Sequence, residues 1–248
     1  DYGGITGTSS ITRISTQPWG LLSGQEAKFF GKTNGADLFV TAAGQHQVIS
    51  VSDDAELEQV REYLAHHESG PRPDLGPDLV ARFRQQAERT SQTLDTVASL
   101  AEVPAAVARY LSGLGLAKQA IAWQTLTELP WQQEGMAVEF RKPVNEDLVG
   151  ITGCFCAVAE TGTLVLLSGP ETFSSAALLP ETHIAIVPVS RIVGAIEDAF
   201  ALAKKERGEL PRATNFISGP SRTGDIEQTI VLGAHGPYRV HVILVAGA

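Results

Sequence analysis

The feature that most constrains the fold is a set of almost wholly apolar runs separated by helix-like segments. Two of these runs are HIAIVP (His183 to Pro188) and RVHVILV (Arg239 to Val245). Such runs are typical of strands buried on both faces. Between them, SRIVGAIEDAFALAK (Ser190 to Lys204) places apolar residues at helical spacing, with Ser190 as a good N-cap. Strands that alternate with helices predict an α/β fold whose mostly parallel sheet is covered by helices on both faces.

The same patterns extend this alternation over most of the chain. Helical spacing is found in two sets of apolar residues, which are Leu79 with Phe83, and Val107 with Tyr110, Leu111 and Leu114. Further strands are predicted at Leu94 to Leu100, Lys118 to Trp123, Phe155 to Glu160, Thr163 to Leu167 and Asn215 to Ser218.

The N-terminal part has a different character. Residues 1–36 are rich in Gly, Ser and Thr and show no countable period, which predicts an irregular arm. Two short strands, Ala36 to Ala42 and Gln47 to Val51, and a helix from Asp53 to about His66 follow. The stretch Glu68 to Asp78 holds three prolines and two glycines and reads as a linker. We therefore expect a variable, partly irregular segment over residues 1–75 and a main domain over 76–248.

Composition excludes several function classes. With 28 acidic and 19 basic residues the formal net charge is −9, which argues against a nucleic-acid partner. Two cysteines, Cys154 and Cys156, are too few for a cluster held by four thiolates, and neither His183 nor His235 has another histidine or a cysteine at metal-ligand spacing. There is neither an apolar run of about 20 residues nor a signal-peptide pattern. We expect a cytoplasmic chain with no membrane partner and with neither a metal nor another cofactor of its own.

Glu160 is the first candidate for catalysis. It closes a predicted apolar strand just before Thr161 and Gly162, so its carboxylate would emerge partly desolvated at a tight turn. Such a group can act as a base or a nucleophile. The alternative, equally weighted, is that Glu160 only accepts hydrogen bonds from amides of the turn.

The segment Ile217 to Gln228 is the second feature. It predicts a strand, a glycine-bearing loop and the start of a helix, which together aim amide groups and Arg222 at an anion. Asp225 and Glu227 fall in the first turn of that helix and could pair with Arg222 instead. Anion binding and a closed Arg–carboxylate pair are about equally favoured.

Two histidines lie at strand ends. His183 begins a strand and His235 lies in a turn, and for both we favour structural hydrogen bonding over catalysis. His183 remains the second candidate for handling a proton. Ligands of open α/β sheets bind beyond the carboxyl ends of strands. We therefore expect one pocket there, built with the ligand-binding candidates Thr161, Gly162, Ser168, Gly169, Arg191, Ser218, Gly219, Ser221, Arg222, Thr223 and Asp225.

Four motifs in this order resemble the lactate utilization protein C family, also known as LutC or YkgG, whose members consist of a LUD domain. They are AETGTLVLLSGP (Ala159 to Pro170), LLPETHIAIVPVSRIV (Leu178 to Val193), LPRATNFISGPSRTGDIEQTIVLGAHGP (Leu210 to Pro237) and HVILV (His241 to Val245). The family pattern places an acidic residue shortly before ETGT, where this chain has Phe155 and Cys156, so Glu160 stands alone. The resemblance does not extend to residues 1–75.

The resemblance implies the three-layer α/β sandwich of the NagB, RpiA and CoA-transferase superfamily. It also implies a role in oxidising L-lactate to pyruvate, as the subunit without an iron–sulfur cluster beside partner subunits that carry such clusters. A small organic acid or an acyl-CoA-like molecule would be the ligand. Two alternatives stay open: an independent CoA-transferase-like or isomerase-like enzyme that uses Glu160, and a scaffold or sensor without catalysis.

Overall fold

The computed structural model describes residues 72–223 and 231–247 in full. Of the preceding segment it describes the backbone of residues 19–22, 26–33, 36–41 and 46–50. The chain divides into two compact units, Asp1–Arg72 and Pro73–Ala248, and each is described by itself. The predicted boundary between residues 75 and 76 stays a prediction.

The first unit contains a four-stranded antiparallel sheet in sequential order. Its strands are β1 (Trp19–Leu22), β2 (Glu26–Thr33), β3 (Ala36–Thr41) and β4 (His46–Ser50). The prediction of β3 and β4 is confirmed, whereas the prediction that residues 1–36 are irregular is wrong for β1 and β2. Backbone pairing with β3 holds β2 in place, and that pairing leaves no period in the sequence. The helix predicted from Asp53 lies outside the described residues.

A six-stranded parallel sheet forms the centre of the second unit. Its spatial order is β5 (Thr93–Val97), β16 (Arg239–Val245), β11 (Thr182–Pro188), β8 (Val149–Thr152), β6 (Gln119–Ala122) and β7 (Ala137–Glu139). All neighbouring strands run parallel. β11 and β16, at the centre, are buried along almost their whole length. The predicted mostly parallel sheet is confirmed.

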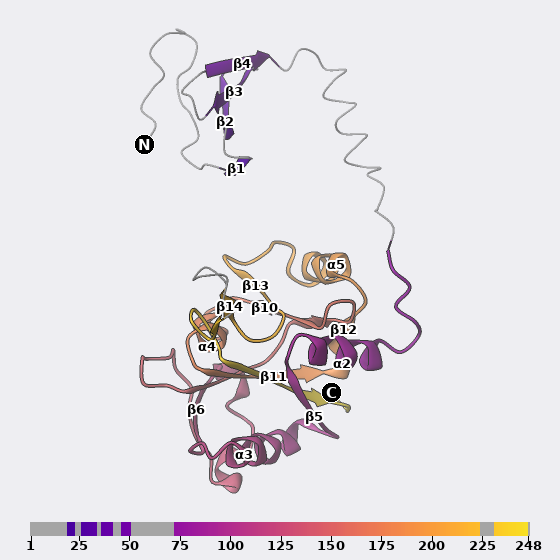
Figure 1. Ribbon diagram of the computed structural model, residues 1–248, viewed down its shortest axis with the longest axis vertical. Coiled ribbons are helices and arrows are strands. Elements are labelled where there is room, and N and C mark those ends of the chain that lie inside the picture. The colour runs from indigo at the N-terminus through magenta and orange to yellow at the C-terminus, as the bar shows by residue number, and fades with distance from the viewer. Residues whose placement is uncertain are drawn as a thin grey trace. The chain divides into compact units, whose positions relative to one another are not determined.

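Helices and a second sheet cover the two faces of this sheet, which gives three layers (Figure 1). α3 (Val103–Gly113) packs on one face, against β5 and β16. α2 (Leu79–Arg89), α4 (Ser175–Leu178) and a four-stranded sheet cover the other. This smaller sheet has the order β12 (Ile192–Val193), β9 (Cys156–Val158), β10 (Thr163–Leu167) and β13 (Thr214–Ile217). The predicted three-layer sandwich is confirmed.

The remaining elements are short, apart from α5 (Ile196–Arg207). Four single turns of 3-10 helix are η1 (Leu100–Glu102), η2 (Gln124–Leu126), η3 (Trp131–Glu134) and η4 (Val189–Arg191). A two-stranded hairpin consists of β14 (Arg222–Thr223) and β15 (Val231–Leu232). Across residues 72–223 and 231–247, none of the helices combines the length and apolar character that crossing a bilayer requires.

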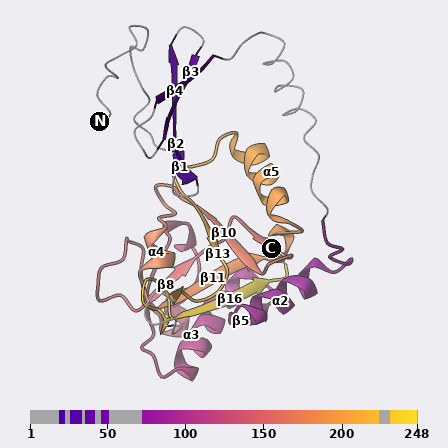
Figure 2. The ribbon, with the colours of Figure 1, turned by 45° about the horizontal axis from the view of Figure 1, so that its top comes forward.

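The two middle strands of the smaller sheet, β9 and β10, are buried on both faces. In β10, Leu164 and Leu166 point into the core shared with the large sheet, whereas Val165 and Leu167 belong to a separate cluster with Ala199 of α5. This alternation follows from the two-residue period of a strand. β10 and β13 therefore lie between α5 and the large sheet, as Figures 1 and 2 show.

The helix predicted to start at Ser190 begins later. The chain first forms η4 and the short strand β12, which pairs with β9, and α5 starts only at Ile196. Its first turn is capped by Asp198, whose carboxylate accepts a hydrogen bond from the backbone N–H of Ala195 at 2.9 Å. The prediction from helical spacing placed the start of the helix too early, because spacing along the chain carries no information about the pairing of β12 with β9.

One buried histidine lies on each face of the large sheet. The His183 ring bonds through Nε2 to the Thr152 hydroxyl at 2.8 Å, and the His241 ring bonds through Nδ1 to the Thr93 hydroxyl at 2.8 Å while stacking on Tyr110 at 3.7 Å. Burial lowers the pKa of His183 to about 3 and that of His241 to about 4. Both rings are therefore neutral in the folded protein at neutral pH.

We predict that the protein loses stability as pH falls from about 6.5 towards 4. In the unfolded chain both histidines take up protons below a pKa of about 6.5, and the folded rings do not, so the folded state becomes relatively less stable by about 2 kcal/mol per histidine between pH 7 and pH 5. Urea unfolding at several pH values measures this. His241→Gln should reduce the slope by about half, and an unchanged slope would contradict this account.

We also predict that Gly150→Ala destabilises the domain by about 3 kcal/mol, because a methyl group there has no space. An added Cβ would lie 2.0 Å from the Ala176 carbonyl oxygen of α4. The matched control is Gly113→Ala near the end of α3, where a Cβ would meet nothing within 4 Å. There the higher helix propensity of alanine should leave stability unchanged or raise it by up to about 1 kcal/mol. Equal losses in chemical denaturation would argue against tight α4–β8 packing.

Candidate functional site

A chain of three hydroxyl groups joins two of the predicted site segments. The Thr161 and Thr163 hydroxyls lie 2.7 Å apart, and the Thr163 hydroxyl is also 2.7 Å from that of Ser218. Thr161 belongs to the tight turn between β9 and β10, and Ser218 directly follows β13. Because β10 and β13 are antiparallel partners, with Leu164 opposite Ile217, the start of one strand meets the end of the other. The structure thus brings these two motifs together.

The turn that follows α2 forms a third wall beside them. Gln92, which is buried, donates from Nε2 to the Gly162 carbonyl oxygen at 2.7 Å and to the Thr90 hydroxyl at 2.9 Å. Gly219, with φ +91°, approaches so closely that an added Cβ would lie 2.1 Å from the Thr90 carbonyl oxygen. Glycine is required here both for its positive φ and for the close approach. Three segments far apart in the sequence therefore meet at residues 90–92.

Arg222 reaches across the same junction. Its Nη2 donates to the Ser91 hydroxyl at 2.6 Å and makes a longer contact of 3.5 Å with the Thr90 carbonyl oxygen. Within residues 72–223 and 231–247, its guanidinium forms no ion pair. The predicted helix start with Asp225 and Glu227 lies outside the described residues, and so does their predicted pairing with Arg222. Of the segment Ile217 to Gln228 the structure describes Ile217 to Thr223, and the last two of these residues, Arg222 and Thr223, are not helical but form β14.

Ser221 and Thr223 flank Arg222 in the hairpin. The Ser221 N–H donates to the Pro237 carbonyl oxygen at 2.9 Å, and the Gly233 N–H donates to the Ser221 carbonyl oxygen at 2.9 Å. Thr223 pairs with Val231 across the hairpin. The hairpin backbone therefore fixes the direction from which Arg222 enters the junction.

Glu160 lies next to the hydroxyl chain, in the turn that contains Thr161. β9 ends at Val158, two residues earlier than predicted, and the Glu160 N–H donates to the Gly194 carbonyl oxygen at 3.0 Å. The residue is half-buried. Its position at a tight turn agrees with the sequence interpretation, and its catalytic role stays a prediction.

The location of this junction corrects one expectation. We expected a pocket at the carboxyl ends of the strands of one sheet, but β9, β10 and β13 form a separate sheet, and Thr90 to Gln92 immediately precede β5 at the amino edge of the large sheet. The rule for open parallel sheets therefore does not describe this junction.

Ser168 and Gly169 lie elsewhere. They follow the carboxyl end of β10, whereas Thr161 precedes its start, so a strand of five residues, roughly 13–17 Å, separates the two groups. Ser168 and Gly169 line a cavity of about 610 Å³ together with Thr125, Thr172, Arg207 and Glu209. The Ser168 hydroxyl accepts a hydrogen bond from the Ala213 N–H at 3.0 Å. The prediction of a single shared pocket is thus wrong.

Arg191 has partners away from the junction. Its Nη1 and Nη2 donate to the two carboxylate oxygens of Glu206 at 2.6 and 2.9 Å, and its Nε donates to the Phe155 carbonyl oxygen at 2.8 Å. This pairing lowers the pKa of Glu206. Arg191 therefore ties η4 to α5 and to the start of β9.

His183 and the two cysteines lie in protected positions. The His183 side chain has no exposed surface, so a ligand reaches it only if the surrounding structure moves. Burial raises the pKa of the Cys154 thiol to about 12 and that of Cys156 to about 11, so both are protonated at neutral pH. Over the part of the chain that the structure describes, no three His, Cys, Asp or Glu side chains are grouped as a metal site would need.

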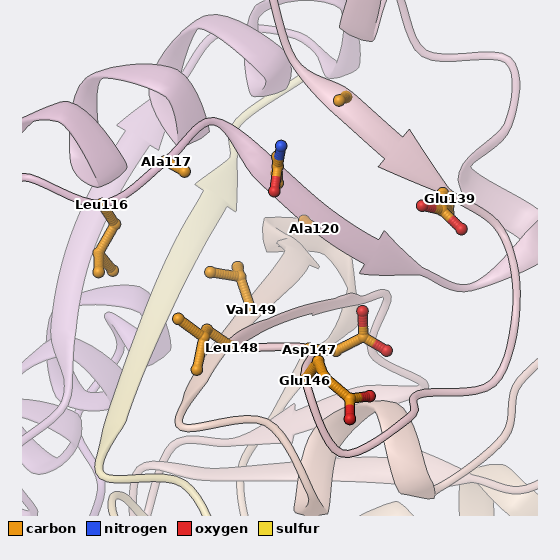
Figure 3. A pocket seen from close by; sticks show the side chains of 10 residues that line it. Leu116, Ala117, Ala120, Glu139, Glu146, Asp147, Leu148 and Val149 are labelled. Atoms are coloured by element: carbon orange, nitrogen blue, oxygen red, sulfur yellow. The ribbon is translucent and has the colours of Figure 1, made fainter.

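A smaller pocket of about 220 Å³ lies between the amino ends of β6 and β8 (Figure 3). Leu116, Leu148 and Val149 form its apolar part, and the carboxylates of Glu139, Glu146 and Asp147 its polar part. Asp147 is already paired with Arg141 at 2.6 Å, and this hydrogen bond lowers the pKa of Asp147. None of the predicted site residues lines this pocket.

Sequence reasoning missed four residues of the junction: Thr90, Ser91, Gln92 and Thr163. The sequence contains a signal for the first three. They belong to a run of polar, mostly hydroxyl-bearing residues between a helix and a strand (RTSQT, Arg89 to Thr93), and such side chains commonly form local hydrogen bonds with the backbone. The contact of Gln92 with Gly162, 70 residues away, leaves no pattern in the local sequence.

Comparisons with known proteins agree with this architecture. The LUD domain family matches residues 40–245, and the chain belongs to that family. The resemblance inferred from the four motifs is thereby confirmed. The match starts at residue 40, in β3 of the first unit, so the expectation that the resemblance leaves out residues 1–75 is wrong for residues 40–75.

Curated relatives carry the name lactate utilization protein C. The Bacillus subtilis protein is 36% identical over 135 residues, which are 50% of this chain and 56% of that protein. The Exiguobacterium sp. protein is 43% identical over 129 residues, again 50% and 56%. The chain spans about half the length of the curated relatives it matches.

A solved structure shares the fold. The crystal structure of a DUF162 family protein from Deinococcus radiodurans matches with a TM-score of 0.52 at 23% identity and covers 68% of this chain and 96% of that chain. It supports the layered α/β architecture of the second unit.

We predict that the Thr163 and Ser218 hydroxyls stabilise each other. Thr163 is almost fully buried, so its hydroxyl depends on Ser218 and Thr161 for hydrogen bonds. In a double-mutant cycle with Thr163→Val and Ser218→Ala, the coupling in the free energy of unfolding should be about 1 kcal/mol. A cycle that pairs Thr163→Val with Ser112→Ala, whose hydroxyl bonds within α3, should be additive. Additivity in the first cycle as well would mean that the two hydroxyls do not interact in solution.

Proposed function

We propose that this chain takes part in lactate utilization, as the subunit without an iron–sulfur cluster in a complex that oxidises L-lactate to pyruvate, in the cytoplasm. Membership of the LUD domain family and the names of the curated relatives support the metabolic role. Iron–sulfur clusters would reside on partner subunits. The two protonated cysteines of this chain do not suit a cluster that needs four thiolates.

One observation carries the assignment of the ligand site: two loops contact residues 90–92. One loop carries the exposed Thr161 hydroxyl and contacts Gln92 through Gly162, and the other carries the exposed Ser218 hydroxyl and Arg222 and contacts Thr90 and Ser91. A guanidinium binds a carboxylate through two parallel hydrogen bonds, and neighbouring hydroxyls donate to or accept from a 2-hydroxyl group. A small hydroxy acid offers both groups. Gly162, Gly219, Ser221 and Thr223 belong to the same two loops and complete the described part of the proposed site, whereas Asp225 lies outside the described residues and stays a prediction.

Glu160 is the proposed proton acceptor. Oxidation of lactate to pyruvate removes two electrons and two protons, one of them from the hydroxyl group. The half-buried Glu160 adjoins the hydroxyl chain, whereas His183 has no exposed surface, so Glu160 suits that proton better. The C2 hydrogen and the two electrons of the C–H bond would be taken up by the partner subunits, and the electrons would reach their iron–sulfur clusters. Ser168, Gly169 and Arg191 lie at other places and would contribute indirectly at most.

We predict that Glu160→Gln combined with Arg222→Ala lowers L-lactate-dependent dye reduction at least about 100-fold when the variant is added to the partner subunits. The double variant lacks both the guanidinium that would bind the carboxylate of lactate and the base that would accept its hydroxyl proton. Size-exclusion chromatography checks that the complex still assembles. The control is Glu197→Gln with Arg212→Ala, which removes the same two charges from exposed positions of α5 and the loop after it.

Three results are informative. Lost activity with intact assembly supports a working site at the junction, provided that the control variant remains active. Full activity of the Glu160 and Arg222 variant would refute the site and favour a scaffold or sensor. An adduct with acyl-CoA, detected by intact mass and removed by hydroxylamine, would instead favour an independent enzyme that uses Glu160 as nucleophile.

A further inference from the structure

The end of α2 has an unusual residue at a position that favours glycine. The Ser91 N–H donates to the Glu88 carbonyl oxygen and the Gln92 N–H to the Ala87 carbonyl oxygen, both at 2.9 Å. These two bonds define the Schellman ending of a helix, in which the residue after the C-cap takes a left-handed conformation. That residue is Ser91, with φ +65°, and it is the only non-glycine residue of residues 72–223 and 231–247 with positive φ.

A serine in this conformation is less favourable than a glycine, because its Cβ crowds the backbone. Local structure alone would therefore select glycine. What serine adds is a hydroxyl group, and that hydroxyl accepts the shorter of the two hydrogen bonds from Arg222, at 2.6 Å. Backbone strain of this kind is characteristic of functional sites, where the surrounding structure enforces it.

We infer that Ser91 is a positioning residue, which holds the Arg222 guanidinium against the end of α2 so that it meets the carboxylate of a small hydroxy acid. This inference rests on the proposed function for the identity of the ligand, but not for the restraint on Arg222. Arg222 is exposed and has several rotatable bonds, so an unrestrained side chain would lose conformational entropy on binding. A side chain held in advance loses less.

When glycine replaces Ser91, stability and lactate affinity should respond in opposite directions. Ser91→Gly removes the hydroxyl but relieves the backbone, so its Tm should rise by about 2–4 °C. Ser91→Ala removes the hydroxyl and keeps the strain, so its Tm should not rise. Ser91→Asn should restore the restraint, since asparagine tolerates this conformation and its side-chain oxygen can accept from Arg222.

Two measurements on the full chain test this. The first is the order of the Arg222 side chain, from NMR relaxation of its Nε–Hε group, assigned by the loss of that signal in Arg222→Lys. The second is calorimetric titration with L-lactate. In Ser91→Gly and Ser91→Ala we expect a mobile Arg222 and an affinity about tenfold lower, as for loss of one hydrogen bond to a charged group. Ser91→Asn should stay close to wild type in both.

The outcomes separate this inference from the proposed function. If Arg222 is equally ordered in wild type and in both hydroxyl-free variants, Ser91 does not position it and the inference is overturned. It is also overturned if Arg222 becomes mobile and lactate affinity is unchanged, or if affinity follows Tm across the variants, as a purely structural role requires. If Arg222 becomes mobile but the wild type binds no L-lactate, the restraint stands and the proposed ligand is wrong.

Discussion

The close approach of two glycines to the end of α2 is the constraint on which the candidate site depends. A Cβ at Gly162 would lie 2.4 Å from the Ala87 backbone nitrogen, and one at Gly219 would lie 2.1 Å from the Thr90 carbonyl oxygen. Backbone therefore packs directly on backbone, with no side chain between. This contact sets the positions of the two loops that carry Thr161 and Ser218, and it allows their hydroxyl groups to come within hydrogen-bond distance of Thr163.

The smaller sheet gives this junction a rigid support. Its alternate residues pack into the shared core on one side and against α5 on the other, so neither face is free to shift. The same rigidity separates the two ends of β10. The hydroxyl chain at its start and the cavity at its end are distinct places, although their residues belong to a single short motif in the sequence.

Local preference and tertiary requirement disagree at Ser91. The helix ending favours glycine, but Arg222 from a loop more than 130 residues away needs an acceptor at that point. Places where local rules fail without an evident structural benefit are often functional. At Gly219, by contrast, local and tertiary requirements coincide, since positive φ and close packing both select glycine.

The sequence by itself determined the class of the fold and those strands and helices whose apolar residues follow a clear period. Apolar runs such as His183 to Pro188 specify buried strands, and their alternation with helices specifies a mostly parallel sheet, because periodicity records burial along a local segment. It also placed Glu160 at a turn. Only the tertiary structure decided that β9, β10 and β13 form a second sheet, that Thr90 to Gln92 join the site, and that Ser168, Arg191 and His183 lie apart from it. The contacts of Gln92 with Gly162 and of Ser91 with Arg222 join residues 70 or more positions apart, and the geometry of packing, which no local pattern encodes, selects them.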